Sequence, residues 1–205
     1  MLKFYPIIDT SIVHISKIED VAKTIIQAGA RIIQLRAKDV STRDFIDTAR
    51  IIKQTIKPIA KKNKVKFIIN DRVDIAMLIC ADGVHLGQDD LTITEARKIL
   101  GNNKIIGIST HNIKEAAIAE KLGADYISFG PIFATSTKGD AQKAKGIDGL
   151  KKAREAVRIP IAAIGGITLE NAIDVYKAGA DCIAVISDIL KADDIKDRVS
   201  KFISL

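Results

Sequence analysis

Short apolar runs recur along the chain, and each is followed by a longer stretch whose apolar residues return at helical spacing. The runs are FYPII at 4–8, RIIQL at 31–35, KFII at 66–69, GVHL at 83–86, KIIGI at 104–108, DYISFG at 125–130, IPIAAIG at 159–165 and CIAVI at 182–186. The pattern predicts eight β-α units, and helical crossovers between the strands make them parallel.

A short turn precedes every second predicted strand. It consists of Gly or Cys, then Ala, then Arg or Asp, at 29–31, 80–82, 123–125 and 179–181. With β-α units of roughly 25 residues, these are the starts of strands two, four, six and eight of a closed barrel. We therefore predict an α/β fold, a single-domain (β/α)8 TIM barrel over residues 1–205. The alternative, a doubly wound open sheet, would need a glycine-rich turn after strand one, which IIDTSI at 7–12 lacks.

Capping-box spacing marks several predicted helix starts. The pairs are Ser16 with Glu19, Ser41 with Asp44, Thr92 with Glu95 and Asn112 with Glu115. The helices are thus expected to begin soon after the strands end.

Composition narrows the class of protein. The 205 residues suit one domain with a substantial core. The net charge of +7, with lysines spread along the chain, favours binding of polyanions but does not indicate which one. The chain has no Trp and does not interleave aromatic with basic residues, so we expect no nucleic-acid partner.

The cysteines and apolar runs bear on location. Cys80, inside a predicted apolar helix, and Cys182, before an apolar strand, indicate small buried hydrophobes rather than a disulfide or metal site. The N-terminal apolar run is too short for a signal peptide, and no apolar segment reaches ~18 residues. We expect a cytoplasmic protein that does not bind membranes.

Two acids follow neighbouring strands in the stretch 66–91. Asp71 and Asp90 each come just after a predicted strand, and ligands of parallel α/β folds gather at such strand ends. Two carboxylates over one cavity repel unless a cation lies between them, and oxygen ligands favour Mg²⁺ together with a phosphorylated substrate. The alternative is that Asp71 caps a helix and Asp90 is a solvated loop residue.

The segment QLRAK at 34–38 ends the second predicted strand. Strand alternation points Gln34, Arg36 and Lys38 into the barrel mouth, with the two residues between them facing the helices. The planar fork of Arg and the point charge of Lys together favour diphosphate binding. The alternative is that both cations pair with surface acids.

Two further strand ends suggest contacts with anions. The long polar connection at 130–140 predicts a mobile lid whose hydroxyls and Lys138 close over an anionic substrate. Gly165 and Gly166, with Ile186 and Ser187, predict a phosphate cradle of backbone N–H groups. The alternatives are a disordered basic loop and a tight turn.

The three histidines differ in their expected roles. His14 lies in a connection and is expected to face solvent, and His85 lies within a predicted strand and is expected in the core. His111 follows the fifth predicted strand, and it is the histidine expected at the ligand site.

Taken together, the motifs resemble those of the thiamine phosphate synthase family. In the family's order and spacing, they are QLRAK at 34–38, NDRVDIA at 70–76, ADGVHLGQDDL at 81–91, GISTHN at 107–112, DYISFGPIFATSTK at 125–138, AIGGI at 163–167 and AVIS at 184–187. The resemblance implies a Mg²⁺-dependent transferase that joins hydroxymethylpyrimidine diphosphate to hydroxyethylthiazole phosphate by a dissociative, carbocation-like substitution. The products are thiamine phosphate and diphosphate, and a homodimer is one option for the assembly.

The resemblance also implies roles for particular residues. The catalytic residues would be Arg36, Lys38 and Lys138, and the metal ligands Asp71 and Asp90. The pyrimidine diphosphate would be bound by Gln34, Leu35, Arg36, Ala37, Lys38, Asn70, Ser109 and Lys138. The thiazole phosphate would be bound by Thr135, Ser136, Thr137, Gly166, Ile186 and Ser187.

One residue departs from the family pattern, because Asp188 beside the phosphate cradle should weaken anion binding unless it points away. A thiazole tautomerase-like relative is an alternative, but such proteins tend to lose the second acid and the Thr-x-Thr-Lys element, which are present here as Asp90 and residues 135–138. A phosphoribosyl isomerase would need an acid-base pair. A non-catalytic regulatory or RNA-binding barrel is the alternative from another class.

Overall fold

Eight parallel strands, paired in sequence order, close into a barrel in the computed structural model, which describes residues 3–63, 65–135 and 143–205. The strands are β1 Phe4–Asp9, β2 Ile32–Arg36, β3 Lys66–Asn70, β4 Gly83–Leu86, β5 Ile105–Thr110, β6 Tyr126–Phe129, β7 Ile161–Ile164 and β8 Cys182–Val185. Pairing of β8 with β1 leaves no open edge. The predicted barrel is confirmed, and the open sheet is excluded.

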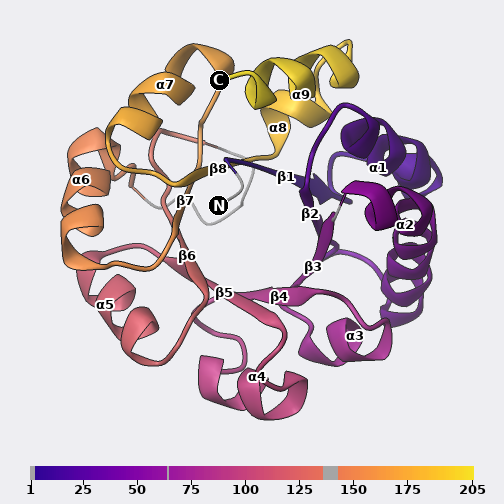
Figure 1. Cartoon of the computed structure of the whole chain (residues 1–205), viewed down its shortest axis with the longest axis horizontal. Coiled ribbons are helices and arrows are strands. Elements are labelled where there is room, and N and C mark those ends of the chain that lie inside the picture. The colour runs from indigo at the N-terminus through magenta and orange to yellow at the C-terminus, as the bar shows by residue number, and fades with distance from the viewer. Residues whose placement is uncertain (1–2, 64, 136–142) are drawn as a thin grey trace.

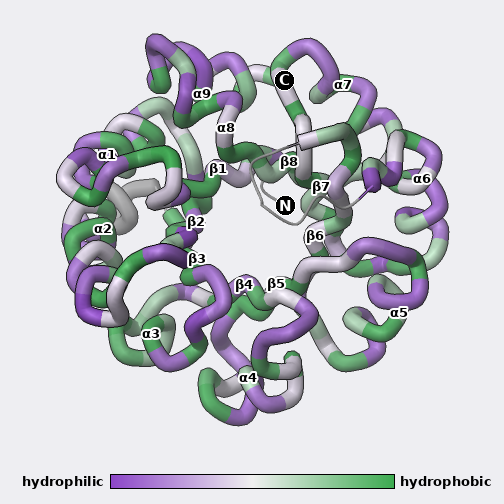
Figure 2. The backbone as a smooth tube through the Cα atoms, turned by 180° about the vertical axis from the view of Figure 1, so that it is seen from behind, coloured by the Kyte–Doolittle hydropathy of each residue, from purple (hydrophilic) through white to green (hydrophobic). Residues whose placement is uncertain are grey.

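Helices form the outer ring around these strands (Figure 1). They are α1 Ile18–Gln27, α2 Thr42–Asn63, α3 Val73–Leu78, α4 Ile93–Leu100, α5 Ile113–Lys121, α6 Gly146–Ala156, α7 Leu169–Lys177, α8 Ser187–Leu190 and α9 Ile195–Ile203, with a 3₁₀ turn η1 at Ile15–Lys17. α1 buries Ile18, Ala22 and Ile25, one stripe at helical spacing. Figure 2 shows hydrophobic and hydrophilic residues alternating along the ring. The apolar stripes cover the outside of the sheet, so its strands are buried on both faces.

The repeated turn before every second strand ends a helix in the left-handed conformation. Its first residue has a positive φ in each copy: 112° at Gly29, 53° at Cys80, 83° at Gly123 and 102° at Gly179. The alanine that follows donates its N–H five residues back, as Ala81 does to the Ala76 carbonyl over 2.8 Å, a hydrogen bond of the Schellman motif. The repeat therefore marks where a helix stops and the next strand enters the barrel.

The aspartates of this turn also tie neighbouring strands together. Each accepts a backbone N–H from the preceding strand: Asp82 from Phe67 at 2.9 Å, Asp125 from Ile106 at 2.7 Å and Asp181 from Ile161 at 2.9 Å. The same carboxylates form ion pairs with Lys66, Arg97 and Arg154. These three aspartates thus join β4, β6 and β8 to the odd-numbered strands before them.

Helix starts follow most of the predicted caps. The backbone N–H groups of Asp44, Glu95 and Glu115 donate to the side chains of Ser41, Thr92 and Asn112, respectively. The prediction for Ser16 was wrong, because η1, capped by His14, comes first and α1 begins only at Ile18.

The two cysteines differ in burial. The prediction for Cys80 was wrong, because α3 ends at Leu78 and Cys80 is exposed in the turn that follows. A left-handed residue cannot continue a right-handed helix, so the chain leaves the apolar face there. Cys182 is buried at the start of β8, as predicted.

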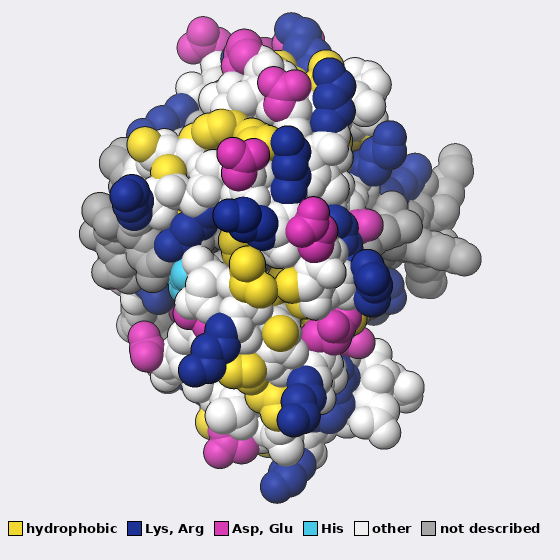
Figure 3. Space-filling view, turned by 90° about the vertical axis from the view of Figure 1, so that its left-hand side faces the viewer, with side chains coloured by type: hydrophobic (Ala, Val, Ile, Leu, Met, Phe, Trp, Pro, Cys, Tyr) yellow, Lys and Arg dark blue, Asp and Glu magenta, His cyan; other side chains and the backbone are white. Residues whose placement is uncertain are grey.

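Charges of both signs share the surface that carries α5, α6 and α7. Figure 3 shows Lys and Arg side chains among Asp and Glu on this side. Ion pairs such as Lys151 with Asp148 and Lys177 with Asp174 lie along these helices. In the described part of the chain, no helix has both the length and the apolar character needed to cross a bilayer.

Candidate active site

A cavity of about 620 Å³ opens at the carboxyl ends of the strands. Its walls come from the connections after β2 through β8. Among its lining residues are ten that the family resemblance assigned to the site: Arg36, Lys38, Asn70, Asp71, Asp90, Ser109, Thr135, Gly166, Ile186 and Ser187. The barrel therefore brings together residues that lie far apart in the sequence.

Three other residues that the family resemblance assigned to the site do not line the cavity. Gln34, Leu35 and Ala37 are buried and do not line the cavity. Strand alternation accounts for Leu35, and Ala37 comes just after the end of β2. Gln34 donates to the Tyr5 hydroxyl in the barrel interior. Their contacts with a substrate stay predictions. Ser136, Thr137 and Lys138 lie outside the described residues.

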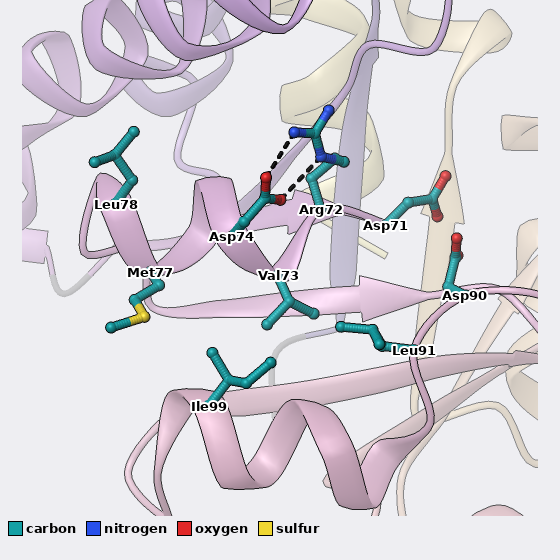
Figure 4. A pocket seen from close by; sticks show the side chains of 9 residues that line it. All are labelled: Asp71, Arg72, Val73, Asp74, Met77, Leu78, Asp90, Leu91 and Ile99. Carbon is teal, nitrogen blue, oxygen red and sulfur yellow. Dashed lines mark hydrogen bonds and ion pairs between the residues drawn. The ribbon is translucent and has the colours of Figure 1, made fainter.

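Asp71 and Asp90 point toward one another across the mouth of the cavity (Figure 4). Asp90 Oδ2 accepts the Gly87 N–H at 2.6 Å, and Lys38 Nζ lies 3.3 Å from Asp71 Oδ2. Asp71 has a φ of 62°, which is unusual for a residue other than glycine and typical of functional sites. The end of β3 thus turns this carboxylate toward its counterpart.

The surroundings of Asp71 disfavour its charged form. Burial raises the pKa of Asp71 above its usual range, and the nearby Asp90 raises it further, against the opposing effect of Lys38. A divalent cation between the oxygens would relieve this repulsion. Within the described ranges no cluster of three or more His, Cys, Asp or Glu could hold a metal ion. A cation held by this pair would need water or substrate oxygens as further ligands, which is typical of Mg²⁺.

Arg36 lines the cavity with an acid behind it. Its Nη1 donates to Asp9 Oδ2 at 2.6 Å, and Asp9 is fully buried at the end of β1. Asp9 directly follows the first apolar run of the sequence, and no sequence motif gave it a role. The barrel register, which sets Asp9 opposite Arg36, is the signal that identifies this pair.

A chain of polar side chains runs from the barrel interior to the cavity. It passes from Gln34 Nε2 to Tyr5 (2.7 Å), from Tyr5 to Tyr126 (3.0 Å between hydroxyls), to His85 Nδ1 (2.8 Å), and from His85 Nε2 to the hydroxyls of Ser109 (3.1 Å) and Ser128 (3.2 Å). Burial raises the pKa of both tyrosines, so they stay protonated. His85 is a buried, hydrogen-bonded residue, as predicted. The hydrogen bonds of Tyr5 and Tyr126 were not predicted, because an aromatic residue in a strand usually indicates a core residue.

The two glycines after β7 make room for another segment of the protein. Phe133 N–H donates to the Gly165 carbonyl at 3.0 Å. Gly166 has a φ of 63°, and a Cβ there would lie 2.7 Å from the Ala134 carbonyl oxygen. The glycines therefore admit the segment after β6, which carries Thr135 to the cavity wall.

Asp188 does not face the cavity. Arg198 of α9 lies 3.3 Å from its carboxylate, and Asp188 is absent from the cavity lining, whereas Ser187 is part of it. The acid that departs from the family pattern therefore points away from the predicted phosphate cradle.

His111 lies at the cavity rim, where the sequence predicted it. Its Nδ1 lies 3.1 Å from Glu115 Oε2, which also accepts the His111 backbone N–H at 2.7 Å. The carboxylate fixes the ring in place.

A second hollow, of about 570 Å³, lies between α3 and α4 beside the acid pair. Most of its lining is apolar: Val73, Met77, Leu78, Leu91 and Ile99 (Figure 4). Its polar lining residues are Asp71, Arg72, Asp74 and Asp90. The first cavity gathers polar groups from many more strand ends, so the first is the candidate active site.

Comparison with known proteins agrees with this arrangement. The family model described as thiamine monophosphate synthase matches residues 4–189. The thiamine-phosphate synthase of Clostridium novyi is 48% identical over 95% of this chain and 93% of its own length. That of Methanosarcina barkeri is 40% identical over 100% of this chain and 90% of its own. The solved structure of thiamine phosphate pyrophosphorylase from Pyrococcus furiosus has a TM-score of 0.85 at 36% identity, covering 99% of this chain and 96% of that one.

Proposed function

The chain belongs to the thiamine monophosphate synthase family, and from that premise we propose that it condenses hydroxymethylpyrimidine diphosphate with hydroxyethylthiazole phosphate to give thiamine phosphate and diphosphate. The observation that carries the proposal is the convergence of Arg36, Lys38 and the facing aspartates on one cavity. That set combines groups that bind diphosphate with groups that hold a divalent cation.

The proposed reaction suits a site lined by positively charged side chains. The bond from the methylene carbon to the diphosphate oxygen breaks first, and the electron-rich aminopyrimidine stabilises the resulting cation. Arg36 and Lys38 bind the negative charge that grows on the leaving group, and donors already aimed at a developing charge stabilise it strongly. We propose that Lys138 adds to them.

Asp71 and Asp90 would hold Mg²⁺, which when bound supplies further positive charge against the departing diphosphate. The fit of these residues to the ion rests on their facing carboxylates and on the raised pKa of Asp71.

The second substrate needs binding rather than activation. The thiazole nitrogen attacks the cation with a free lone pair and has no proton to lose, so no base is required. We propose that its phosphate lies against Gly166, Ile186 and Ser187, with Thr135 to Thr137 closing over it. Because Asp188 pairs with Arg198, its charge does not oppose this binding.

The direct test is turnover by the purified protein. With both substrates and Mg²⁺ we expect thiamine phosphate and diphosphate in equal amounts, and no diphosphate when the thiazole phosphate is replaced by inorganic phosphate. Salt-sensitive RNA binding without turnover would favour a nucleic-acid-binding barrel instead.

The acid pair predicts an unusual pH dependence of stability in metal-free protein. The pKa of Asp71 is higher in the folded than in the unfolded chain, so its ionisation favours unfolding as the pH rises above about 4. Asp71→Asn removes this effect and should stabilise the metal-free protein, most at neutral pH. Urea unfolding in EDTA across this pH range measures the difference.

Asp74 is the matched control, because Arg72 lowers its pKa in the folded protein. Asp74→Asn should therefore cost a little stability at neutral pH, because the ion pair is exposed, and the loss should vanish as the pH falls through that lowered value. Equal pH profiles for Asp71→Asn and the unaltered protein would contradict a raised pKa of Asp71 in the folded protein.

A further inference from the structure

Asp9 and Arg36 form a pair that crosses from the barrel interior to the cavity. Asp9 ends β1, is fully buried and does not line the cavity. Arg36 ends the neighbouring strand β2 and does line it. The two residues are partners in the strand register, and the Thr10 N–H donates to the Arg36 carbonyl at 3.0 Å. Their backbones are thus fixed relative to each other.

The carboxylate of Asp9 is held from both sides. Its Oδ1 accepts the Ser11 N–H at 3.0 Å and the Ser11 hydroxyl at 2.8 Å. Its Oδ2 accepts Arg36 Nη1 at 2.6 Å. A buried charge with these partners has little freedom to move.

Arg36 has donors to spare. Among the residues that the structure describes, Asp9 is its hydrogen-bond partner, which leaves the other guanidinium N–H groups for a ligand in the cavity. Asp9 binds Nη1 of the planar guanidinium group, so the direction of the remaining N–H donors is set before any ligand binds.

We infer that Asp9 is a positioning residue, which acts through Arg36 and never touches the substrate. The inference rests on the proposed function, because the group that Arg36 meets is the diphosphate of the pyrimidine substrate. A long arginine side chain without an anchor must be ordered during binding. An arginine anchored by Asp9 is already in position when the diphosphate departs. Misplacement of a catalytic group by about 1 Å can lower the rate 10²-fold.

The test is Asp9→Asn alone and combined with Arg36→Met. We expect Asp9→Asn to lower kcat/KM for the pyrimidine diphosphate by about 10- to 100-fold, while KM for the thiazole phosphate changes by less than about twofold. If Asp9 acts through Arg36, the double variant should be no slower than Arg36→Met alone. The double variant should also be more stable than Arg36→Met, because it lacks an unpaired buried carboxylate.

Asp181→Asn is the matched control. Asp181 also accepts a backbone N–H and pairs with an arginine, Arg154, at 2.7 Å, but at the opposite end of the barrel. We expect it to lower the melting temperature and leave kcat/KM unchanged, which separates a loss of stability from a loss of positioning.

Unaltered kcat/KM in Asp9→Asn, or losses that multiply in the double variant, would overturn the inference. Should Asp9→Asn fail to fold, Ser11→Ala removes one of the bonds to the carboxylate. Its expected loss of about 3- to 10-fold should disappear in the Arg36→Met background, and a loss that persists there would also overturn the inference. Absence of turnover in the unaltered protein would instead count against the proposed function.

Discussion

Replacing Asp71 with alanine should lower the rate of thiamine phosphate formation by about 10³-fold or more, and EDTA should do the same to the unaltered protein. Asp71 faces Asp90 at the cavity mouth, and neither acid alone would hold a weakly bound ion such as Mg²⁺. The product should be measured directly by chromatography of stopped reactions, because a coupled pyrophosphatase assay itself depends on magnesium.

Asp74→Ala is the control for this prediction. Asp74 lies three residues further along the chain, in the first turn of α3. Its carboxylate binds the Arg72 guanidinium at 2.6 and 2.9 Å (Figure 4), and it lines the second hollow but not the active-site cavity. We expect its activity to stay within about twofold of the unaltered protein, since an exposed ion pair contributes little. Full activity of Asp71→Ala, or of the unaltered protein in EDTA, would remove the metal from the proposed function.

The second large effect is expected from Arg36→Met. Removing one preorganised donor from a site where charge develops typically costs about 10²- to 10³-fold in rate, and we expect that loss in kcat/KM for the pyrimidine diphosphate. Steady-state kinetics with each substrate varied in turn should place the effect on this substrate. If only KM for the thiazole phosphate changed, the assignment of Arg36 to the pyrimidine diphosphate would be wrong.

Stability must be measured beside activity for this variant. Asp9 is fully buried, and removing the partner of a buried charge typically costs about 3–5 kcal/mol. Circular dichroism at the assay temperature gives the folded fraction by which the rates are corrected. Arg72→Met, which removes an exposed guanidinium outside the cavity, should be active and nearly as stable as the unaltered protein.

The sequence by itself determined the barrel and most of the cavity wall. Apolar runs and helical stretches are local patterns, and each strand depends on a few adjacent residues, so eight of them could be placed without tertiary information. Once the barrel is assumed, strand ends must converge, which is why Lys38, Asn70, Asp90 and Ser187 could be assigned to one site. The turn repeated before alternate strands was also readable, because Gly or Cys ends each helix at a left-handed position.

Only the tertiary structure decided which polar groups are partners. Asp9 and Arg36 are distant in sequence, and strand register sets them side by side. In the same way, Asp188 turns to Arg198, and Gly166 makes room for Ala134, because separate elements pack at those points. Hydrogen bonds and ion pairs depend on distances of a few tenths of an ångström between residues that local patterns do not connect. Local sequence therefore determines which helices and strands form, and closure of the barrel determines which of their side chains come into contact.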